Sequence, residues 1–199
     1  MKHSIAQMAA CLNDGGVILI PTDTVFGLIA KADNATGVDK IFDLKQRPKN
    51  RNLPIMVANA DQLSSLGLEI TENMNRLLDS DFMPGALTIV AGFKDQPSVE
   101  WLKGREEIAF RIPNDEALLN LMNEVGPILA TSANRHGNPT VFDNVADILE
   151  DLNGQPELVI EGTNQTHKPS TIINCRMHPP KIEREGHLSE VEIFNFLNL

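Results

Sequence analysis

Apolar residues recur at every third or fourth position in several stretches of the chain, the spacing of a helix that buries one face. In the first stretch the pattern covers residues 5–12 and stops at the turn formers of residues 13–16. Thr71 is suited to cap one later helix, and Asp143 or Asn144 another. Helices are expected over residues 5–12, 35–45, 61–66, 71–78, 116–125, 145–152 and 189–197.

Short apolar runs alternate with these helical stretches. The run Val-Ile-Leu-Ile at residues 17–20 is continuous, which is typical of a strand buried on both faces, and Pro21 ends it. Strands are expected at residues 17–20, 53–57, 87–90, 108–112, 128–130, 158–160, 171–173 and 181–182. Because strands and helices interleave, the pattern predicts an α/β fold with a mixed sheet.

Length and charge narrow this picture. No linker or repeat divides the 199 residues, so we expect a single domain over residues 1–199. The net charge of -10 makes the chain a poor candidate for tight nucleic-acid binding on its own, because such binding neutralises phosphates with cations.

The two cysteines and the N-terminus bear on the compartment. Cys11 and Cys175 have no metal-ligand spacing with another cysteine or histidine, which favours ordinary thiols in a reducing cytosol. Residues 1–4 do not open a secretion signal, and no run reaches the roughly 18 apolar residues of a membrane span. We therefore expect a cytoplasmic protein that uses no membrane.

The densest group of cations follows the helix at 35–45. Lys45 and Arg47 flank a glutamine, and Lys49 and Arg51 come next. One interpretation is a helix C-terminus that carries a cation, followed by a solvated loop. The other is an anion site, because these cations in a chain of net charge -10 make a strong local positive field. Triphosphate is the partner that such a field favours.

Hydrogen-bonding side chains stand at the ends of two expected strands, where α/β folds bind ligands. Thr24 lies in the Pro-Thr-Asp-Thr turn after residues 17–20, and Ser132 and Asn134 follow residues 128–130. The alternatives are a plain turn for the first segment and a helix cap for the second.

Arg111 lies inside the apolar strand at 108–112. Its side chain either faces outward or points inward, where an unpaired charge would be very costly. An inward arginine could clamp a substrate carboxylate through two parallel hydrogen bonds.

Several common motifs are absent from the sequence. It contains no Gly-x-x-x-x-Gly-Lys phosphate loop, no Gly-x-Gly-x-x-Gly after a strand and no Gly-x-Ser-x-Gly elbow. The five histidines are scattered without metal spacing, so we expect no dedicated metal site.

Six segments, taken in order, resemble the TsaC/YrdC family of threonylcarbamoyl-AMP synthases. They span about residues 15–186, and they are residues 21–28, 45–48, 84–88, 109–113, 131–134 and 169–172. The resemblance implies a YrdC-like fold, in which a twisted mixed sheet with flanking helices surrounds a concave, positively charged cavity. The chain ends soon after these segments, as in the short, single-domain bacterial members.

The resemblance also implies an enzyme. As a nucleotidyltransferase it would make threonylcarbamoyl-AMP and pyrophosphate from L-threonine, bicarbonate and ATP, with Mg²⁺ arriving on the ATP. Partner proteins would then transfer the threonylcarbamoyl group to tRNA, which the chain would meet only indirectly.

Eight residues match the family's functional positions. L-Threonine would be bound by Thr24, Arg111 and Ser170. ATP would be bound by Lys45, Arg47, Ser132, Asn134 and Arg184, with Lys45 and Arg47 as the catalytic contacts to the phosphates.

Two other functions stay open at this point. One is a YrdC-like paralogue that binds a nucleotide or RNA without this reaction. The acidic net charge argues against RNA binding, and the complete set of site residues argues for a synthase. The other is a carbamoyl-transfer module of the kind embedded in larger hydrogenase-maturation proteins. Use of carbamoyl phosphate in place of threonine would distinguish it.

Overall fold

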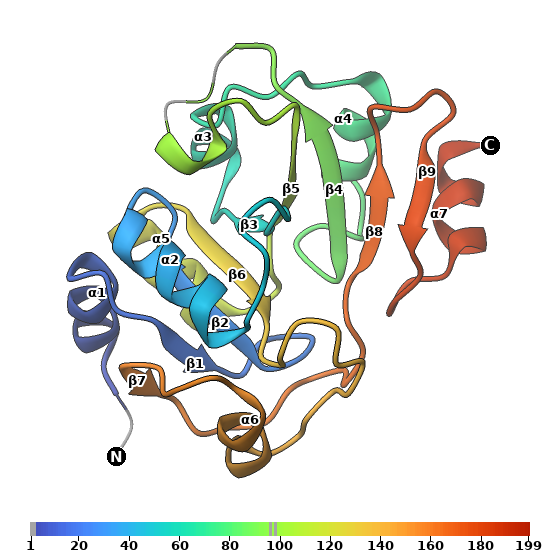
Figure 1. The fold of residues 1–199 in the computed structure, drawn as a ribbon. Coiled ribbons are helices and arrows are strands. Elements are labelled where there is room, and N and C mark those ends of the chain that lie inside the picture. The colour runs from blue at the N-terminus through green and yellow to red at the C-terminus, as the bar shows by residue number, and fades with distance from the viewer. Residues whose placement is uncertain (1–2, 96, 98) are drawn as a thin grey trace.

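The structure is a computed structural model that describes residues 3–95, 97 and 99–199 (Figure 1). The helices of this part are α1 (Ile5–Asn13), α2 (Ala35–Leu44), α3 (Ala60–Ser64), α4 (Glu72–Leu78), α5 (Glu116–Val125), α6 (Val145–Asp151) and α7 (Glu190–Leu197), with a short 3-10 helix η1 (Glu100–Leu102). The strands are β1 (Ile18–Ile20), β2 (Gly27–Lys31), β3 (Ile55–Met56), β4 (Leu87–Gly92), β5 (Glu107–Arg111), β6 (Ile128–Ser132), β7 (Leu158–Val159), β8 (Thr171–Asn174) and β9 (Lys181–Arg184).

The predicted helices all form, and side chains cap them as the sequence indicated. The hydroxyl of Thr71 accepts a hydrogen bond from the Met74 N–H at 3.3 Å, and the cap of α6 is Asn144, whose side chain accepts from the Asp147 N–H. Two elements were not predicted, strand β2 and helix η1. Both are short and follow turn residues, so neither shows a periodic pattern of its own.

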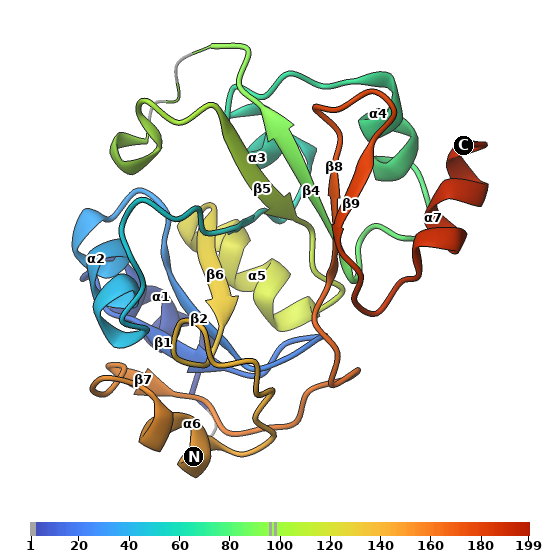
Figure 2. The same cartoon turned by 45° about the vertical axis from the view of Figure 1, so that its right-hand side comes forward.

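The strands form one mixed sheet in the order β7-β1-β2-β6-β3-β5-β4-β8-β9. Strand β2 pairs antiparallel with both β1 and β6, and β3 joins the two halves by pairing antiparallel with β6 and parallel with β5. Strands β4 and β8 are parallel neighbours, and β9 closes the far edge (Figure 2). The predicted α/β class with a mixed sheet is confirmed.

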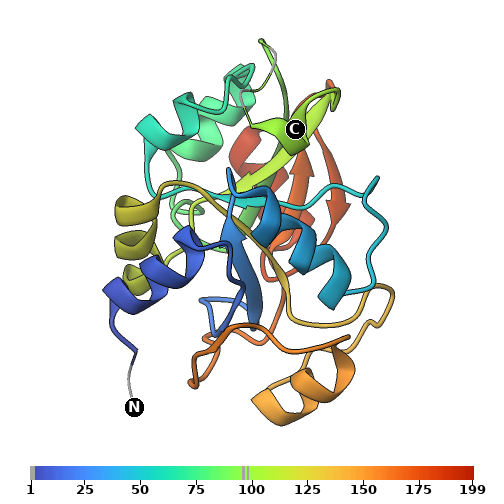
Figure 3. The same cartoon turned by 60° about the vertical axis from the view of Figure 1, so that its left-hand side comes forward.

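Helices cover both faces of the half that contains β1, β2 and β6. Helices α1 and α5 lie side by side on one face, where Leu12 and Leu121 are fully buried (Figure 3). Helices α2 and α6 cover the opposite face through Ile41 and Ile148. The continuous apolar run of β1 is explained by this double cover, as expected for a strand buried on both faces.

The other half of the sheet is covered on one face only. Helices α3, α4 and α7 pack there against Ile89, Phe110 and Ile173. The alternate side chains of the same strands point the other way, and they line a cavity that the helices leave open.

Among the described residues, no helix combines the length and the apolar character needed to cross a bilayer.

Candidate active site

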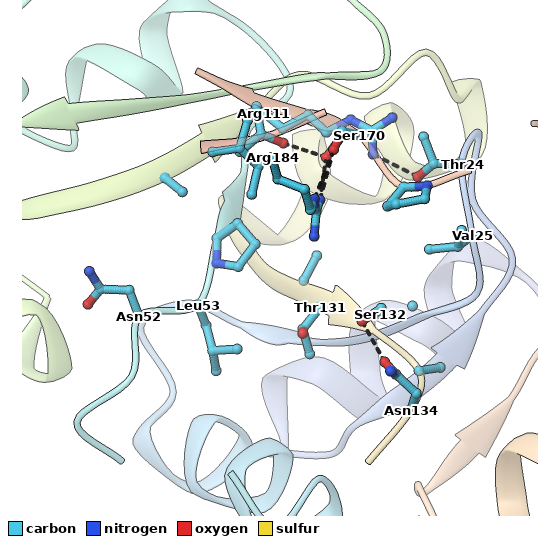
Figure 4. Close-up of a pocket in the computed structure, with 18 of the residues that line it drawn as sticks. Thr24, Val25, Asn52, Leu53, Arg111, Thr131, Ser132, Asn134, Ser170 and Arg184 are labelled. Carbon is cyan, nitrogen blue, oxygen red and sulfur yellow. Dashed lines mark hydrogen bonds between the residues drawn. The ribbon is translucent and has the colours of Figure 1, made fainter. Parts of the chain in front are cut away.

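A pocket of about 720 Å³ lies over the uncovered face of β5, β4 and β8 (Figure 4). Its side walls are the loop at residues 50–54 and the loop at residues 138–142. The charged residues of the lining are Arg47, Arg51, Arg111, Arg184, Glu107 and Glu183. Arginines thus outnumber glutamates four to two, a net formal charge of +2 inside a chain whose net charge is -10.

Thr24 stands on one side of the pocket in a turn that its own side chains hold together. The Thr22 hydroxyl donates to the Val25 carbonyl at 2.8 Å and accepts from the Thr24 N–H at 3.0 Å. The two threonine hydroxyls are 3.1 Å apart. The turn interpretation and the pocket interpretation of this segment are therefore compatible, because the turn orients Thr24 into the lining.

Arg111 points inward and is 3% exposed. Its Nη2 donates to the Asp23 carboxylate at 2.7 Å, its Nη1 to the Thr24 hydroxyl at 2.8 Å and its Nε to the Gly85 carbonyl at 2.7 Å. Burial lowers the pKa of Arg111, and Asp23 opposes that lowering. The outward-facing alternative is wrong, and the guanidinium fixes Thr24 while it lines the pocket.

Ser170 and Arg184 lie beside Arg111 in Figure 4. The Ser170 hydroxyl is 2.8 Å from that of Thr88, across the pairing of β4 with the segment that leads into β8. The Arg184 Nη2 donates to the Ser170 carbonyl at 2.8 Å. The antiparallel return of β9 along β8 therefore brings Arg184 onto the same wall as Ser170.

Gly186 allows β9 to approach this wall. A Cβ at this position would meet the Pro169 carbonyl oxygen and would lie 2.6 Å from the Ser170 carbonyl oxygen. We expect Gly186→Ala to lower the free energy of unfolding by about 1–3 kcal/mol and to displace Ser170. The matched control is Gly92→Ala, whose Cβ would lie 3.6 Å from the nearest side-chain atom. Equal urea midpoints for the two variants would contradict this.

Ser132 and Asn134 occupy the opposite side of the pocket (Figure 4). The Ser132 hydroxyl donates to Asn134 Oδ1 at 2.6 Å, and Asn134 Nδ2 donates to the Asn138 carbonyl at 2.5 Å. Ser132 is the last residue of β6, and the next helix along the chain is capped by Asn144. The helix-cap alternative for Ser132 and Asn134 is therefore wrong.

Lys45 lies beneath that segment and is not among the residues that line the pocket. It is 2% exposed, and its Nζ donates to the Ser132 carbonyl at 2.5 Å and to the Asn134 carbonyl. A direct contact with phosphate would require the ammonium to leave these carbonyls. The interpretation as a solvated helix end is wrong for Lys45, whereas Lys49 is exposed and pairs with Asp39.

Burial lowers the pKa of Lys45 from 10.5 to about 7, with a further lowering by Arg47 and an opposing effect of Asp151. Between these two pKa values an unfolded chain binds more protons at this position than the folded protein does, so the contribution of Lys45 to stability rises with pH there. We expect the free energy of unfolding of the wild type, relative to Lys45→Met, to increase from pH 7 towards pH 10 in urea titrations. A constant difference would contradict the lowered pKa.

Arg47 reaches the pocket directly and is half-buried. Its Nη2 donates to the Asn52 carbonyl at 2.8 Å, and its Nη1 is 3.1 Å from His136 Nδ1. The Nε is buried and has no hydrogen-bond partner among the residues that the structure describes. Burial and the nearby Arg51 lower the pKa of Arg47. An anion bound beside Arg47 would therefore stabilise its charged guanidinium.

The structure thus brings seven of the eight predicted residues to one pocket and places the eighth, Lys45, behind its wall. Sequence reasoning missed Asp23, the buried partner of Arg111, although it lies in the same turn as Thr24. It also missed Thr88 and the loop at residues 138–142. The carboxylate of Asp23 next to Thr24 and the arginine at 111 in an apolar strand could each have suggested a buried ion pair. No local sequence pattern indicates that these two residues pair with each other.

Within the described ranges, no three histidine, cysteine, aspartate or glutamate side chains are grouped so that they could hold a metal ion. The two lining carboxylates are already engaged, Glu107 by Arg176 and Glu183 by Asn174.

Comparisons with known proteins agree with this architecture. Threonylcarbamoyl-AMP synthase of Bacillus subtilis is 36% identical over 194 residues, which are 95% of this chain and 55% of that protein. The protein YciO of Escherichia coli, described as uncharacterized, is 29% identical over 93% of this chain and 90% of its own length. The chain spans just over half the length of the first of these relatives.

Solved structures give the same result. The structure of Pyrococcus abyssi Sua5 complexed with L-threonine superposes with a TM-score of 0.85 at 32% identity, covering 97% of this chain and 57% of that one. E. coli YciO superposes with a TM-score of 0.81 at 26% identity, covering 96% of this chain and 92% of that one. The Sua5/YciO/YrdC family model, which carries the description "Telomere recombination", matches residues 10–186. The chain therefore belongs to the Sua5/YciO/YrdC family.

Proposed function

We propose that the protein makes threonylcarbamoyl-AMP and pyrophosphate from L-threonine, bicarbonate and ATP, as a nucleotidyltransferase. The observation that carries the proposal is the pocket itself, which has an arginine with hydroxyl neighbours on one side and Arg47 with Ser132 and Asn134 on the other. Relatives named threonylcarbamoyl-AMP synthase and the Sua5 structure with L-threonine support it.

The amino acid is proposed to bind beside Arg111. A guanidinium has five N–H donors, and Arg111 uses three of them on protein oxygens. One donor on each terminal nitrogen is left for the threonine carboxylate, which suits the paired geometry of an arginine–carboxylate contact. Thr24 and Ser170 then offer hydroxyls to the substrate amine and hydroxyl.

The nucleotide is proposed to lie against the opposite side. Arg47 supplies positive charge for the phosphates there, and Ser132 and Asn134 supply polar contacts. Arg184 adds positive charge from the wall that it shares with Ser170. Lys45 is proposed to act on this site through the Ser132 and Asn134 carbonyls, which it holds in place.

The chemistry needs no side-chain nucleophile. The threonine nitrogen bonds to the bicarbonate carbon and water leaves, which gives a carbamate. A carbamate oxygen then bonds to the α-phosphorus of ATP while the bond to the bridging oxygen breaks, and pyrophosphate leaves. Placing the reactants together and neutralising the charge of the leaving group are the protein's contributions.

Mg²⁺ enters the proposal only as the counter-ion of ATP, because the carboxylates of the pocket, Glu107 and Glu183, are engaged by protein partners. Transfer of the product to tRNA by other proteins, and a location in the cytoplasm where ATP and tRNA are found, belong to the same proposal.

The test is pyrophosphate release by the purified protein with Mg²⁺, ATP and bicarbonate, with and without L-threonine. Mass spectrometry should detect threonylcarbamoyl-AMP. L-Valine, which has nearly the same shape but no hydroxyl, is the matched control and should give little product. A folded protein that releases no pyrophosphate with threonine would exclude the proposal, and release with carbamoyl phosphate instead would favour a carbamoyl-transfer module.

A further inference from the structure

The loop after α2 forms one side wall of the pocket. It has no helix or strand of its own between Arg47 and Pro54, yet Arg47 and the side chains of residues 50–54 line the cavity. The position of this loop therefore decides where its cations lie. An irregular loop keeps one position only if contacts from outside the pocket hold it.

Arg105 supplies such contacts from behind the wall. Its side chain is not part of the pocket lining. Its Nη2 donates to the Lys49 carbonyl at 3.0 Å, and its Nη1 donates to Asn52 Oδ1. Its Nε donates to the Trp101 carbonyl at 3.0 Å, so one guanidinium ties two points of the loop to helix η1.

The same bonds connect Arg105 to Arg47. Asn52 accepts from Arg105 through its side chain, and its carbonyl accepts from Arg47 Nη2 at 2.8 Å. Asn52 is thus held on one side by Arg105, which lies outside the pocket, while on the other side it orients Arg47. A shift of the Asn52 backbone would move the acceptor that fixes the Arg47 guanidinium.

Trp101 anchors Arg105 to the body of the fold. The indole Nε1 donates to the Ala32 carbonyl at 2.7 Å, at the end of β2. The guanidinium carbon of Arg105 lies 5.5 Å from the centre of the Trp101 ring, within the range of a cation–π contact. The partly buried ring packs against the hydrophobic clusters of both halves of the sheet, which makes it a rigid support.

We propose that Arg105, supported by Trp101, is a positioning residue that fixes the loop at residues 47–54 for ATP, and that Trp101 reports on ATP binding there. The proposal rests on the proposed function in placing ATP at Arg47. It predicts that Arg105→Ala weakens ATP binding about tenfold, because the cations of the wall lose their fixed positions. Threonine contacts come from the other side of the pocket, so the KM for threonine should stay within about twofold of the wild type.

The matched control is Arg76→Ala. Arg76 donates to the carbonyls of Leu197 and Phe196, at 2.8 and 2.7 Å, and its guanidinium carbon lies 5.8 Å from the Phe196 ring. It therefore makes the same kinds of contact as Arg105, but none of its partners lines the pocket. Both variants should lower the Tm by similar amounts, and only Arg105→Ala should change the Kd for ATP.

Trp101 provides a second measurement. It is the one tryptophan of the chain, which contains no tyrosine, so the intrinsic emission excited at tryptophan wavelengths comes from this ring. Titration of the wild type with Mg²⁺ and ATP, without threonine, should change the emission of Trp101. In Arg105→Ala at saturating ATP that change should be absent.

Calorimetric titration of ATP separates this inference from the proposed function, because it needs no catalysis. An ATP Kd that rises in Arg105→Ala and not in Arg76→Ala supports the positioning role, even if the wild type were to make no threonylcarbamoyl-AMP. An unchanged ATP Kd in Arg105→Ala, or a wild type that binds no ATP, overturns it. If ATP does not change the tryptophan emission of the wild type, the proposal that Trp101 reports on ATP binding is overturned.

Discussion

Replacing Lys45 by alanine is expected to lower threonine-dependent pyrophosphate release about hundredfold or more. The Lys45 ammonium joins the carbonyls of Ser132 and Asn134, whose side chains form the proposed nucleotide wall. Without it, two carbonyl groups in a buried environment lose the donor that they share, and the segment loses the shape that it presents to ATP. The measurement is the steady-state rate as a function of ATP, where the loss should appear largely as a higher KM for ATP.

Lys40 offers the control on the same helix. It is a partly exposed lysine whose ammonium pairs with the Glu157 carboxylate at the surface, away from the pocket. Lys40→Ala removes the same charge from α2 and should leave the rate within about twofold, because exposed ion pairs contribute little. Wild-type kinetics in Lys45→Ala would show that the Ser132–Asn134 segment keeps its shape unaided, and the role proposed for Lys45 would then be abandoned.

Replacing Arg111 by alanine is expected to lower the free energy of unfolding by about 3–5 kcal/mol. Arg111 and Asp23 form an ion pair whose side chains are both 4% exposed. Asp23 Oδ1 is already buried without a hydrogen-bond partner in the described part of the chain, so loss of the arginine leaves a carboxylate whose charge is compensated mainly by the Asn114 N–H. Urea unfolding of the purified variant measures this loss.

A double-mutant cycle separates the pair from the rest of the site. Asp23→Ala alone should also destabilise the protein, since it leaves the Arg111 guanidinium without its counter-charge. The double variant should be more stable than the sum of the two single losses predicts, because no charge is then left alone. If the stability losses of the two single variants add up to that of the double variant within about 0.5 kcal/mol, the two residues are not coupled. Arg111 would then keep only its proposed role in binding threonine.

Local sequence patterns predicted a helix or strand well wherever its burial follows from the spacing of its own apolar residues. Helix α5 was expected at residues 116–125 and is found at Glu116–Val125, because its apolar residues repeat every three or four positions. Strand β2 was missed. Its residues follow a turn, and their burial depends on pairing with β6, which is distant in the sequence, as well as with the neighbouring β1.

The role of Lys45 shows the limit of such patterns. A cation at a helix end is equally compatible with water, with a ligand and with burial, and the sequence has no feature that chooses among them. Its carbonyl partners lie 87 and 89 positions further along the chain. Only the tertiary structure, which brings the segment at residues 132–136 against the end of α2, decides that the ammonium lies under the pocket wall.

The sequence by itself determined the α/β class, the positions of nearly every helix and strand and, through its resemblance to a known family, seven of the residues that line the pocket. The class and the element positions follow from spacings of two and of three to four residues, which are properties of short segments. The tertiary structure alone decided the strand order, the pairing of Arg111 with Asp23 across 88 positions, and the support of the loop at residues 47–54 by Arg105. The physical reason is that such contacts depend on which segments the sheet brings together, and no local spacing encodes that choice.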